Sequence, residues 1–172
     1  MRNSGKSKLL LRLLIFLCLI SALVFIDQWT KMLAVNTLKN KEPFVILDGV
    51  LEFSYLENEG AAFGTMKGMR TVFLFFAPLV STVLLVLALK YFPDQKFRPL
   101  SFCFLFIIAG AIGNFIDRLR LSYVVDFIYF RLIDFPVFNV ADIYVTCASI
   151  VLILLILFKY KDEDFEKKPD LQ

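Results

Sequence analysis

Two aspartates occur in apolar stretches of this chain, where a segment buried in lipid would avoid a charge. Asp126 lies within the apolar residues 123–130, and Asp142 ends residues 135–142, which lead directly into a longer apolar run. An ionised carboxylate at membrane depth is costly, so such residues usually mark a functional site. Two of them in a chain without histidine indicate carboxylate-pair chemistry at a membrane surface.

A pair of carboxyl groups is suited to the hydrolysis of an amide. That reaction needs a base to activate water and an acid to polarise the carbonyl group. Two close carboxyl groups do not both ionise easily, so one can serve as the base and the other as the acid. Such chemistry needs no metal, nucleophilic side chain or cofactor. The absence of histidine also excludes Ser-His-Asp and Cys-His nucleophiles and His-ligated zinc.

Further polar residues follow helical spacing. Asn114, Asp117 and Arg118 are three and four positions apart, so a helix would present all three on one face. Asn139 and Asp142 are three positions apart and share a face in the same way. Arg118 would lie at the membrane boundary, where it suits pairing with a carboxylate or a lipid phosphate.

A structural interpretation of the same residues stays open. Asp142 could cap a helix, and Asp117 and Arg118 could belong to an interfacial ion-pair network. The three cysteines lie inside apolar runs without CxxC spacing and are interpreted as small core residues. A functional site is favoured because many carboxylate, amide and basic residues would reach one membrane interface. They are Asp27, Asn58, Asn114, Asp117, Arg118, Asp126, Asn139 and Asp142.

Long apolar helices must position these residues. The chain has 172 residues and is 59% hydrophobic, whereas soluble domains contain about 45–50% apolar residues. The apolar residues form long runs, each near the roughly 20 residues that cross a bilayer as a helix. We predict an all-α membrane protein with one domain over residues 1–172. Its spans are expected at about residues 9–26, 71–92, 100–116 and 137–158.

The first span could instead be a cleaved signal peptide, because basic residues precede its apolar centre. It lacks an Ala-x-Ala-like cleavage site, however, and the bulky residues before Cys18 do not suit lipid attachment. It also leads into residues 27–31, which are typical of a helix end with an interfacial anchor. We therefore expect a retained helix that ends near this point.

The distribution of basic residues predicts the orientation of the chain. Basic residues gather at the N-terminus, between the second and third spans, and in the tail after residue 158. The positive-inside rule places these three regions, and both termini, in the cytoplasm. Residues 27–70 and 117–136 then face outward. A net charge of +3 is too small to indicate a nucleic-acid partner.

The first outward segment is long enough to hold structure. Residues 44–56 predict two short strands around an Asp-Gly turn at Asp48 and Gly49. Residues 58–64 contain two glycines and two alanines, which suit either a close backbone approach or an ordinary flexible turn. The glycines between residues 60 and 68 make this region a candidate for mobility.

Five short blocks of this sequence resemble, in order, those of the lipoprotein signal peptidase family, also called signal peptidase II. The blocks are residues 27–31, 58–64, 113–118, 124–127 and 138–142. The resemblance extends over nearly the whole chain, from the first span to the fourth. It implies a bacterial aspartyl peptidase with four transmembrane helices and a small β-structured cradle on the outer side.

The resemblance also implies roles for individual residues. The catalytic pair of the family corresponds to Asp126 and Asp142, with Asp117 as a rival that is assigned a supporting role beside Arg118. Asp27 is expected to be structural and to pair with Lys31, one helical turn away. The residues expected to support or bind the substrate are Asn58, Gly60, Asn114, Asp117, Arg118 and Asn139.

The family implies a prolipoprotein substrate that carries diacylglycerol on a cysteine and is cut just before that cysteine. The expected place of action is the outer face of the bacterial cytoplasmic membrane, where membrane lipid surrounds a monomeric enzyme without a cofactor. Three alternatives remain at this stage. They are a small transporter with buried acids as ion sites, a membrane scaffold, and a family member that binds lipoproteins without cutting them.

Overall fold

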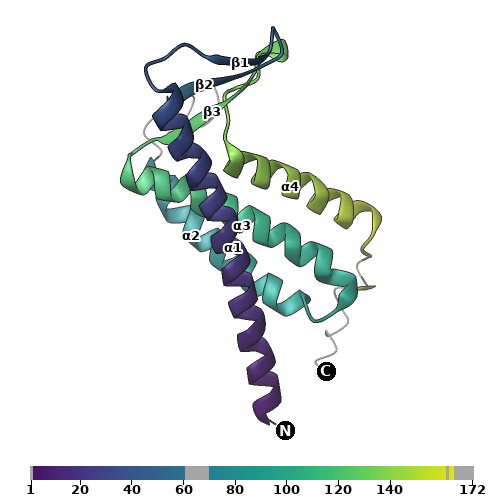
Figure 1. Ribbon diagram of the computed structural model, residues 1–172. Coiled ribbons are helices and arrows are strands. Elements are labelled where there is room, and N and C mark those ends of the chain that lie inside the picture. The colour runs from purple at the N-terminus through teal and green to yellow at the C-terminus, as the bar shows by residue number, and fades with distance from the viewer. Residues whose placement is uncertain (1, 61–69, 162, 165–172) are drawn as a thin grey trace.

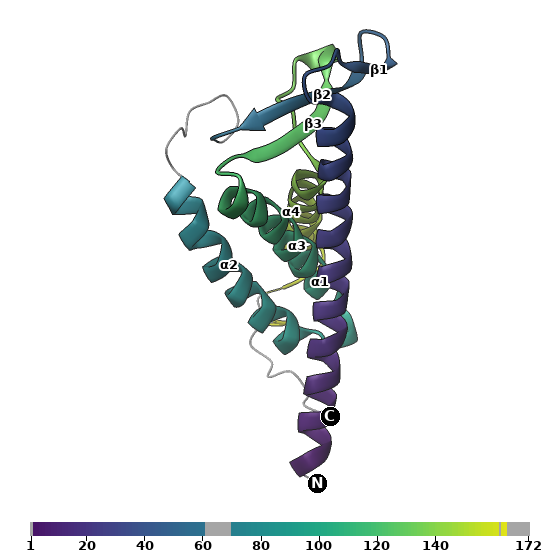
Figure 2. The same ribbon diagram turned by 60° about the vertical axis from the view of Figure 1, so that its left-hand side comes forward.

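Four long apolar helices form most of the part of the chain that the computed structural model describes, which is residues 2–60, 70–161 and 163–164. They are α1 (Arg2–Leu38), α2 (Arg70–Tyr91), α3 (Arg98–Arg120) and α4 (Val140–Phe158). Each is long and apolar enough to cross a membrane, which confirms the prediction of four helices. The helix α3 packs against the other three and lies between α1 and α2 (Figure 2).

The helix α1 is longer than the sequence predicted. It continues to Leu38, so residues 27–31 lie inside the helix and the expectation of a helix end there is wrong. With a rise of about 1.5 Å per residue, this helix of 37 residues is longer than the roughly 30 Å thickness of the hydrocarbon core of a bilayer. Its last turns carry the sheet, because the buried Ala34 and Leu38 pack in one cluster with Val125 and Phe127.

A three-stranded antiparallel sheet caps one end of the helix bundle (Figure 1). Its strands, in spatial order, are β1 (Phe44–Leu47), β2 (Leu51–Asn58) and β3 (Val124–Phe130). The predicted hairpin around Asp48 and Gly49 is confirmed, and Gly49 has the positive φ of 69° that such a turn requires. The glycine- and alanine-rich residues 61–69 lie outside the described residues.

The strand β3 was not predicted from the sequence, which assigned residues 117–136 only to an outward segment. Its register with β2 places Asn58 opposite Val124 and Leu56 opposite Asp126. The run Val124–Phe130 is rich in β-branched and aromatic residues, which suit a pleated, half-buried surface. After β3, the 3-10 helix η3 (Arg131–Ile133) leads the chain back toward α4. The sheet therefore joins the first outward segment to the second.

Candidate active site

Asp126 lies at the centre of a buried cluster of amide groups. Only 1% of this residue is exposed, and both of its carboxylate oxygens accept hydrogen bonds. Asn58, at the end of β2, donates from Nδ2 to Asp126 Oδ2 at 2.8 Å. Asn139 donates from Nδ2 to Asp126 Oδ1 at 2.6 Å. The pairing of β2 with β3 explains why Asn58 can reach this carboxyl group.

Asp142 lies in the first turn of α4, in a capping box. Asn139 is the N-cap, and its Oδ1 accepts from the Asp142 backbone N–H at 3.0 Å. In return the Asn139 N–H donates to Asp142 Oδ2 at 3.1 Å. Asp142 is therefore not the cap itself, and its carboxylate benefits from the positive end of the helix dipole. Asn114 on α3 donates from Nδ2 to Asp142 Oδ1 at 2.8 Å.

Asn139 links the two aspartates. It is fully buried, and its Nδ2 donates to both Asp126 Oδ1 and, at 3.1 Å, Asn114 Oδ1. Its place beside β3 follows from the preceding residue. Phe138 exchanges backbone hydrogen bonds with Ile128 at 2.8 and 3.0 Å. The start of α4 is thereby held against the strand that carries Asp126.

The electrostatics of the pair favour a shared proton. Burial raises the pKa of Asp126 to about 7, and the negative charge of Asp142 adds to this rise. The hydrogen bonds from Asn58 and Asn139, and the charge of Lys31, act in the opposite direction. A carboxyl group with a pKa near neutrality can both donate and accept a proton at physiological pH.

A second buried cluster lies beside the first and contains a lysine. Lys31 Nζ lies 3.0 Å from both Asp27 Oδ2 and Asp117 Oδ2, so the predicted pair of Asp27 and Lys31 forms. Lys31 also donates to Asn114 Oδ1 at 2.9 Å. The amide of Asn114 thus lies between the lysine cluster and Asp142.

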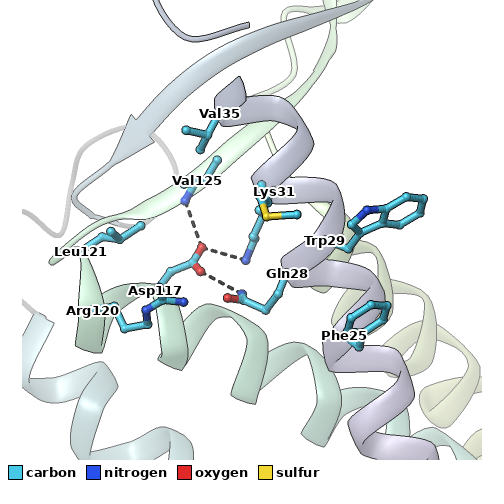
Figure 3. Close-up of a pocket in the computed structure, with 10 residues that line it drawn as sticks. Phe25, Gln28, Trp29, Lys31, Val35, Asp117, Arg120, Leu121 and Val125 are labelled. Carbon is cyan, nitrogen blue, oxygen red and sulfur yellow. Dashed lines mark hydrogen bonds and ion pairs between the residues drawn. The ribbon is translucent and has the colours of Figure 1, made fainter. Parts of the chain in front are cut away.

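The lysine cluster ties four elements together. Asp117 Oδ2 accepts from the Val125 N–H of β3 at 3.1 Å, and Asp27 Oδ1 accepts from the Ala141 N–H of α4 at 2.9 Å. Gln28, which the sequence interpretation did not single out, donates from Nε2 to Asp117 Oδ1 at 2.9 Å (Figure 3). Its position within residues 27–31, one of the five blocks that resemble the family, could have marked Gln28 as a site residue. A carbon atom at Gly113 would lie 2.5 Å from Asp27 Oδ2, so close packing of α1 and α3 requires this glycine.

Comparison with known proteins gives the family. The family model described as signal peptidase (SPase) II matches residues 19–158. The lipoprotein signal peptidase of Enterococcus faecalis is 41% identical over 148 residues, which cover 83% of this chain and 91% of that protein. The corresponding protein of Clostridium tetani is 38% identical over 84% of this chain and 92% of its own length. This chain belongs to the signal peptidase II family.

A solved structure agrees with this assignment. A bacterial membrane enzyme determined by the in meso method at 2.3 Å resolution has a TM-score of 0.75 and 30% identity, covering 92% of this chain and 94% of that one. Members of the signal peptidase II family are aspartic peptidases, and the activity of this chain is that of a lipoprotein signal peptidase. The family assignment favours an enzyme over the transporter and scaffold alternatives.

Arg118, Asp117 and Gly60, the remaining predicted residues, lie at the same end of the molecule. The guanidinium of Arg118 lies 4.3 Å from the ring centre of Phe73, and its Nη1 donates to the Asn114 carbonyl oxygen at 3.4 Å. Asp117 bonds to Lys31 and Gln28 instead of its sequence neighbour. The buried Gly60 donates its N–H to Asn58 Oδ1 at 3.0 Å, which turns the Asn58 amide nitrogen toward Asp126.

Proposed function

We propose that Asp126 and Asp142 are the catalytic pair, and that this peptidase removes signal peptides from prolipoproteins that carry diacylglycerol on a cysteine. The cut would fall directly before that cysteine. The observation that carries the proposal is the pair of carboxyl groups joined through Asn139, whose hydrogen-bond donors within the described residues are all neutral amides. The family membership supports the substrate class, because the relatives are lipoprotein signal peptidases.

The two carboxyl groups would play different parts at the start of the reaction. Asp126 carries the proton, because burial raises its pKa to about 7. Asp142 is assigned the part of the base, since it lies in the first turn of α4 and accepts hydrogen bonds from Asn114 of α3 and from the Asn139 N–H. Asp142 therefore serves as the base and Asp126 as the acid, although the proton belongs to the pair as a whole.

The proposed reaction balances without an additional group. Water attacks the scissile carbonyl carbon while one of its protons passes to Asp142, and Asp126 gives its proton to the carbonyl oxygen. The resulting tetrahedral diol then collapses. Asp142 passes its proton to the leaving nitrogen as the C–N bond breaks, and a diol hydroxyl returns a proton to Asp126. The pair is restored after each cut.

Lys31 has a positioning role in this proposal. A lysine ammonium can only donate, so its contact with Asn114 Oδ1 fixes which end of that amide faces Asp142. The Asn114 amide nitrogen then points at the carboxylate of Asp142. The lysine cluster would thus orient the dyad without touching the substrate.

The membrane setting fits this substrate. The positive-inside rule places the sheet end of the bundle outside the cytoplasmic membrane, with both termini inside. The signal helix and acyl chains of the substrate would lie in the bilayer, with the scissile bond at the outer interface. Arg118 would hold substrate carbonyl groups or the lipid head region, whereas the amides of Asn58, Asn114 and Asn139 would support the dyad to which they donate. We propose one peptidase domain over residues 1–172 that acts as a monomer.

Cleavage by the purified protein tests the proposal. A diacylglyceryl-modified prolipoprotein in detergent would be incubated with wild type and with Asp126→Asn, Asp142→Asn and Asp117→Asn. The exposed Asp48→Asn in the hairpin turn is the control with the same charge change. Cleavage before the modified cysteine by wild type and Asp48→Asn, but not by the first two variants, is the expected result.

Other outcomes of this experiment are equally informative. If Asp117→Asn is inactive while Asp126→Asn still cuts, the peptidase assignment stands and the proposed pair is wrong. If the folded wild type binds the lipidated substrate without cutting it, the chain is the non-catalytic binder considered above. Cleavage of the unmodified prolipoprotein at the same rate would contradict the role assigned to the lipid.

A further inference from the structure

A cleft of about 390 Å³ lies between α1, the end of α3 and the start of β3 (Figure 3). This volume is within the range of small-ligand sites, roughly 300–1,000 Å³. Its walls are mostly apolar side chains that no other part of the described chain covers. The exposed apolar side chains of the cleft include Phe25, Trp29 and Met32, which are 67%, 49% and 53% exposed. Val35 and Leu121 also line it.

The polar atoms on the floor of this cleft are already bonded to one another. Gln28 Nε2 and Lys31 Nζ both contact the carboxylate of Asp117 (Figure 3). Lys31 Nζ also lies 3.0 Å from Asp27 Oδ2. Asp117 also accepts from the Val125 N–H. A polar ligand would find few free partners on this floor. An apolar acyl chain needs no hydrogen-bond partner and therefore suits the cleft better.

One charge at the cleft is left without a counter-ion. Arg120 is the last residue of α3, is exposed, and lines the cleft. Among the described residues no carboxylate lies within ion-pair distance of its guanidinium. Arg118 does not share this position, because residues two apart differ by about 200° around a helix. Arg118 faces the dyad side of α3, whereas Arg120 faces α1.

We propose that this cleft binds an anionic phospholipid of the bilayer. One acyl chain lies against Phe25, Trp29 and Met32, and the phosphate contacts Arg120. A planar guanidinium is well matched to a phosphate, and Trp29 is of the residue type enriched at the lipid headgroup level. The lipid is a bilayer lipid and not the substrate's own, since the lysine cluster separates the cleft from the dyad.

The test measures lipid binding and does not depend on the proposed cleavage. The full chain in detergent is titrated with phosphatidylglycerol and, separately, with phosphatidylcholine, and bound lipid is counted by native mass spectrometry. The variants are Arg120→Gln, which removes the charge, and Met32→Trp, which fills the cleft. The control is Lys41→Gln, the same charge change at an exposed residue beyond the end of α1. Thermal unfolding verifies that each variant is folded.

We expect wild type to bind phosphatidylglycerol more tightly than phosphatidylcholine. Arg120→Gln should raise the Kd for phosphatidylglycerol about fivefold, the size of one basic contact at a membrane surface, and that for phosphatidylcholine less, because its choline cation offsets the charge of the phosphate. Met32→Trp should weaken the binding of both lipids, and Lys41→Gln should change the binding of neither. Equal effects of Arg120→Gln and Lys41→Gln would overturn the site, as would no effect of Met32→Trp. Displacement of phosphatidylglycerol by lipidated prolipoprotein on Asp142→Asn would assign the cleft to the substrate's acyl chains instead.

Discussion

Two carboxylate pairs lie side by side at the sheet end of the bundle, and they differ in what joins them; three of the four aspartates are buried, and Asp142 is half-buried. Asp27 and Asp117 share the ammonium of Lys31, at 3.0 Å from each. Asp126 and Asp142 are joined through the neutral Asn139, whose side-chain amide donates to Asp126 and whose backbone N–H donates to Asp142. The first pair stands on α1 and α3 and the second on β3 and α4, and the group that joins the two carboxylates differs between them.

A cation between two carboxylates compensates their charge where water cannot. A neutral amide orients two carboxyl groups but leaves their repulsion in place, which favours a proton on one of them. Burial, to which the charge of Asp142 adds, raises the pKa of Asp126 to about 7. The comparison shows that the group between two carboxylates decides their role. A cation makes the pair a structural ion-pair network, whereas a neutral amide leaves the pair able to exchange a proton.

The largest expected effect breaks the chemical pair. Asp126→Asn or Asp142→Asn should lower kcat/KM by about 10²–10⁴-fold, the usual contribution of a general acid or base. Thermal unfolding should shift less than for loss of a buried ion pair, because asparagine fills the same space and only one donor loses its acceptor, at a cost of about 1–3 kcal/mol. Steady-state cleavage of lipidated prolipoprotein measures kcat/KM, and a thermal unfolding curve measures stability. A large loss of stability with either variant would show that this pair is structural too.

Removing the cation tests the other pair. Lys31→Met leaves two buried carboxylates unpaired, and breaking such a pair costs about 3–5 kcal/mol of unfolding free energy. The control is Lys39→Met, whose exposed contact with Glu57 at 2.8 Å should contribute nothing measurable. Chemical unfolding in detergent gives the two values. The double variant Lys31→Met with Asp117→Asn should recover part of the loss, and no recovery would contradict the assigned charge balance.

Local patterns in the sequence were sufficient for much of this molecule. The four helices follow from four apolar runs, and the hairpin follows from Asp48 and Gly49 between β-forming residues. The pairing of Asp27 with Lys31 follows from their spacing of one turn. Each of these features depends on residues close together in the chain, where periodicity and turn chemistry are strong.

Contacts between distant segments could not be predicted in the same way. The helix α1 continues through residues 27–31 because Asp117, 86 residues after Lys31, balances the lysine. The strand β3 forms because β2 offers a free edge. Asp117 was expected in a supporting role beside Arg118, and its partners in the structure, Lys31 and Gln28, come from α1, about 90 residues away in the chain. Only the packed structure shows which partner each buried charge finds.

An intermediate effect is expected where the two pairs meet. Asn114→Leu keeps Lys31 bonded to Asp27 and Asp117 but removes the donor to Asp142. A hydrogen bond to a charged group contributes about 1.5–3 kcal/mol, so kcat should fall roughly 10- to 100-fold. KM should change little if Asn114 acts through the dyad. A change in KM alone would place Asn114 at the substrate and not between the two clusters.

The smallest expected effect is a shift in the pH profile. Because Asp126 must be protonated to act as the acid, kcat/KM should fall above about pH 7, tenfold for each further pH unit. The Asn58 hydrogen bond lowers this pKa, so Asn58→Leu should move the alkaline limb of the pH–rate profile to higher pH.

The raised pKa of Asp126 also determines the sign of a stability change with pH. The folded state binds the Asp126 proton more tightly than the unfolded state, so this group's contribution to stability falls as pH rises from about 4 to about 7. Asp126→Asn should remove that part of the pH dependence, and an identical slope in both proteins would argue against a protonated Asp126.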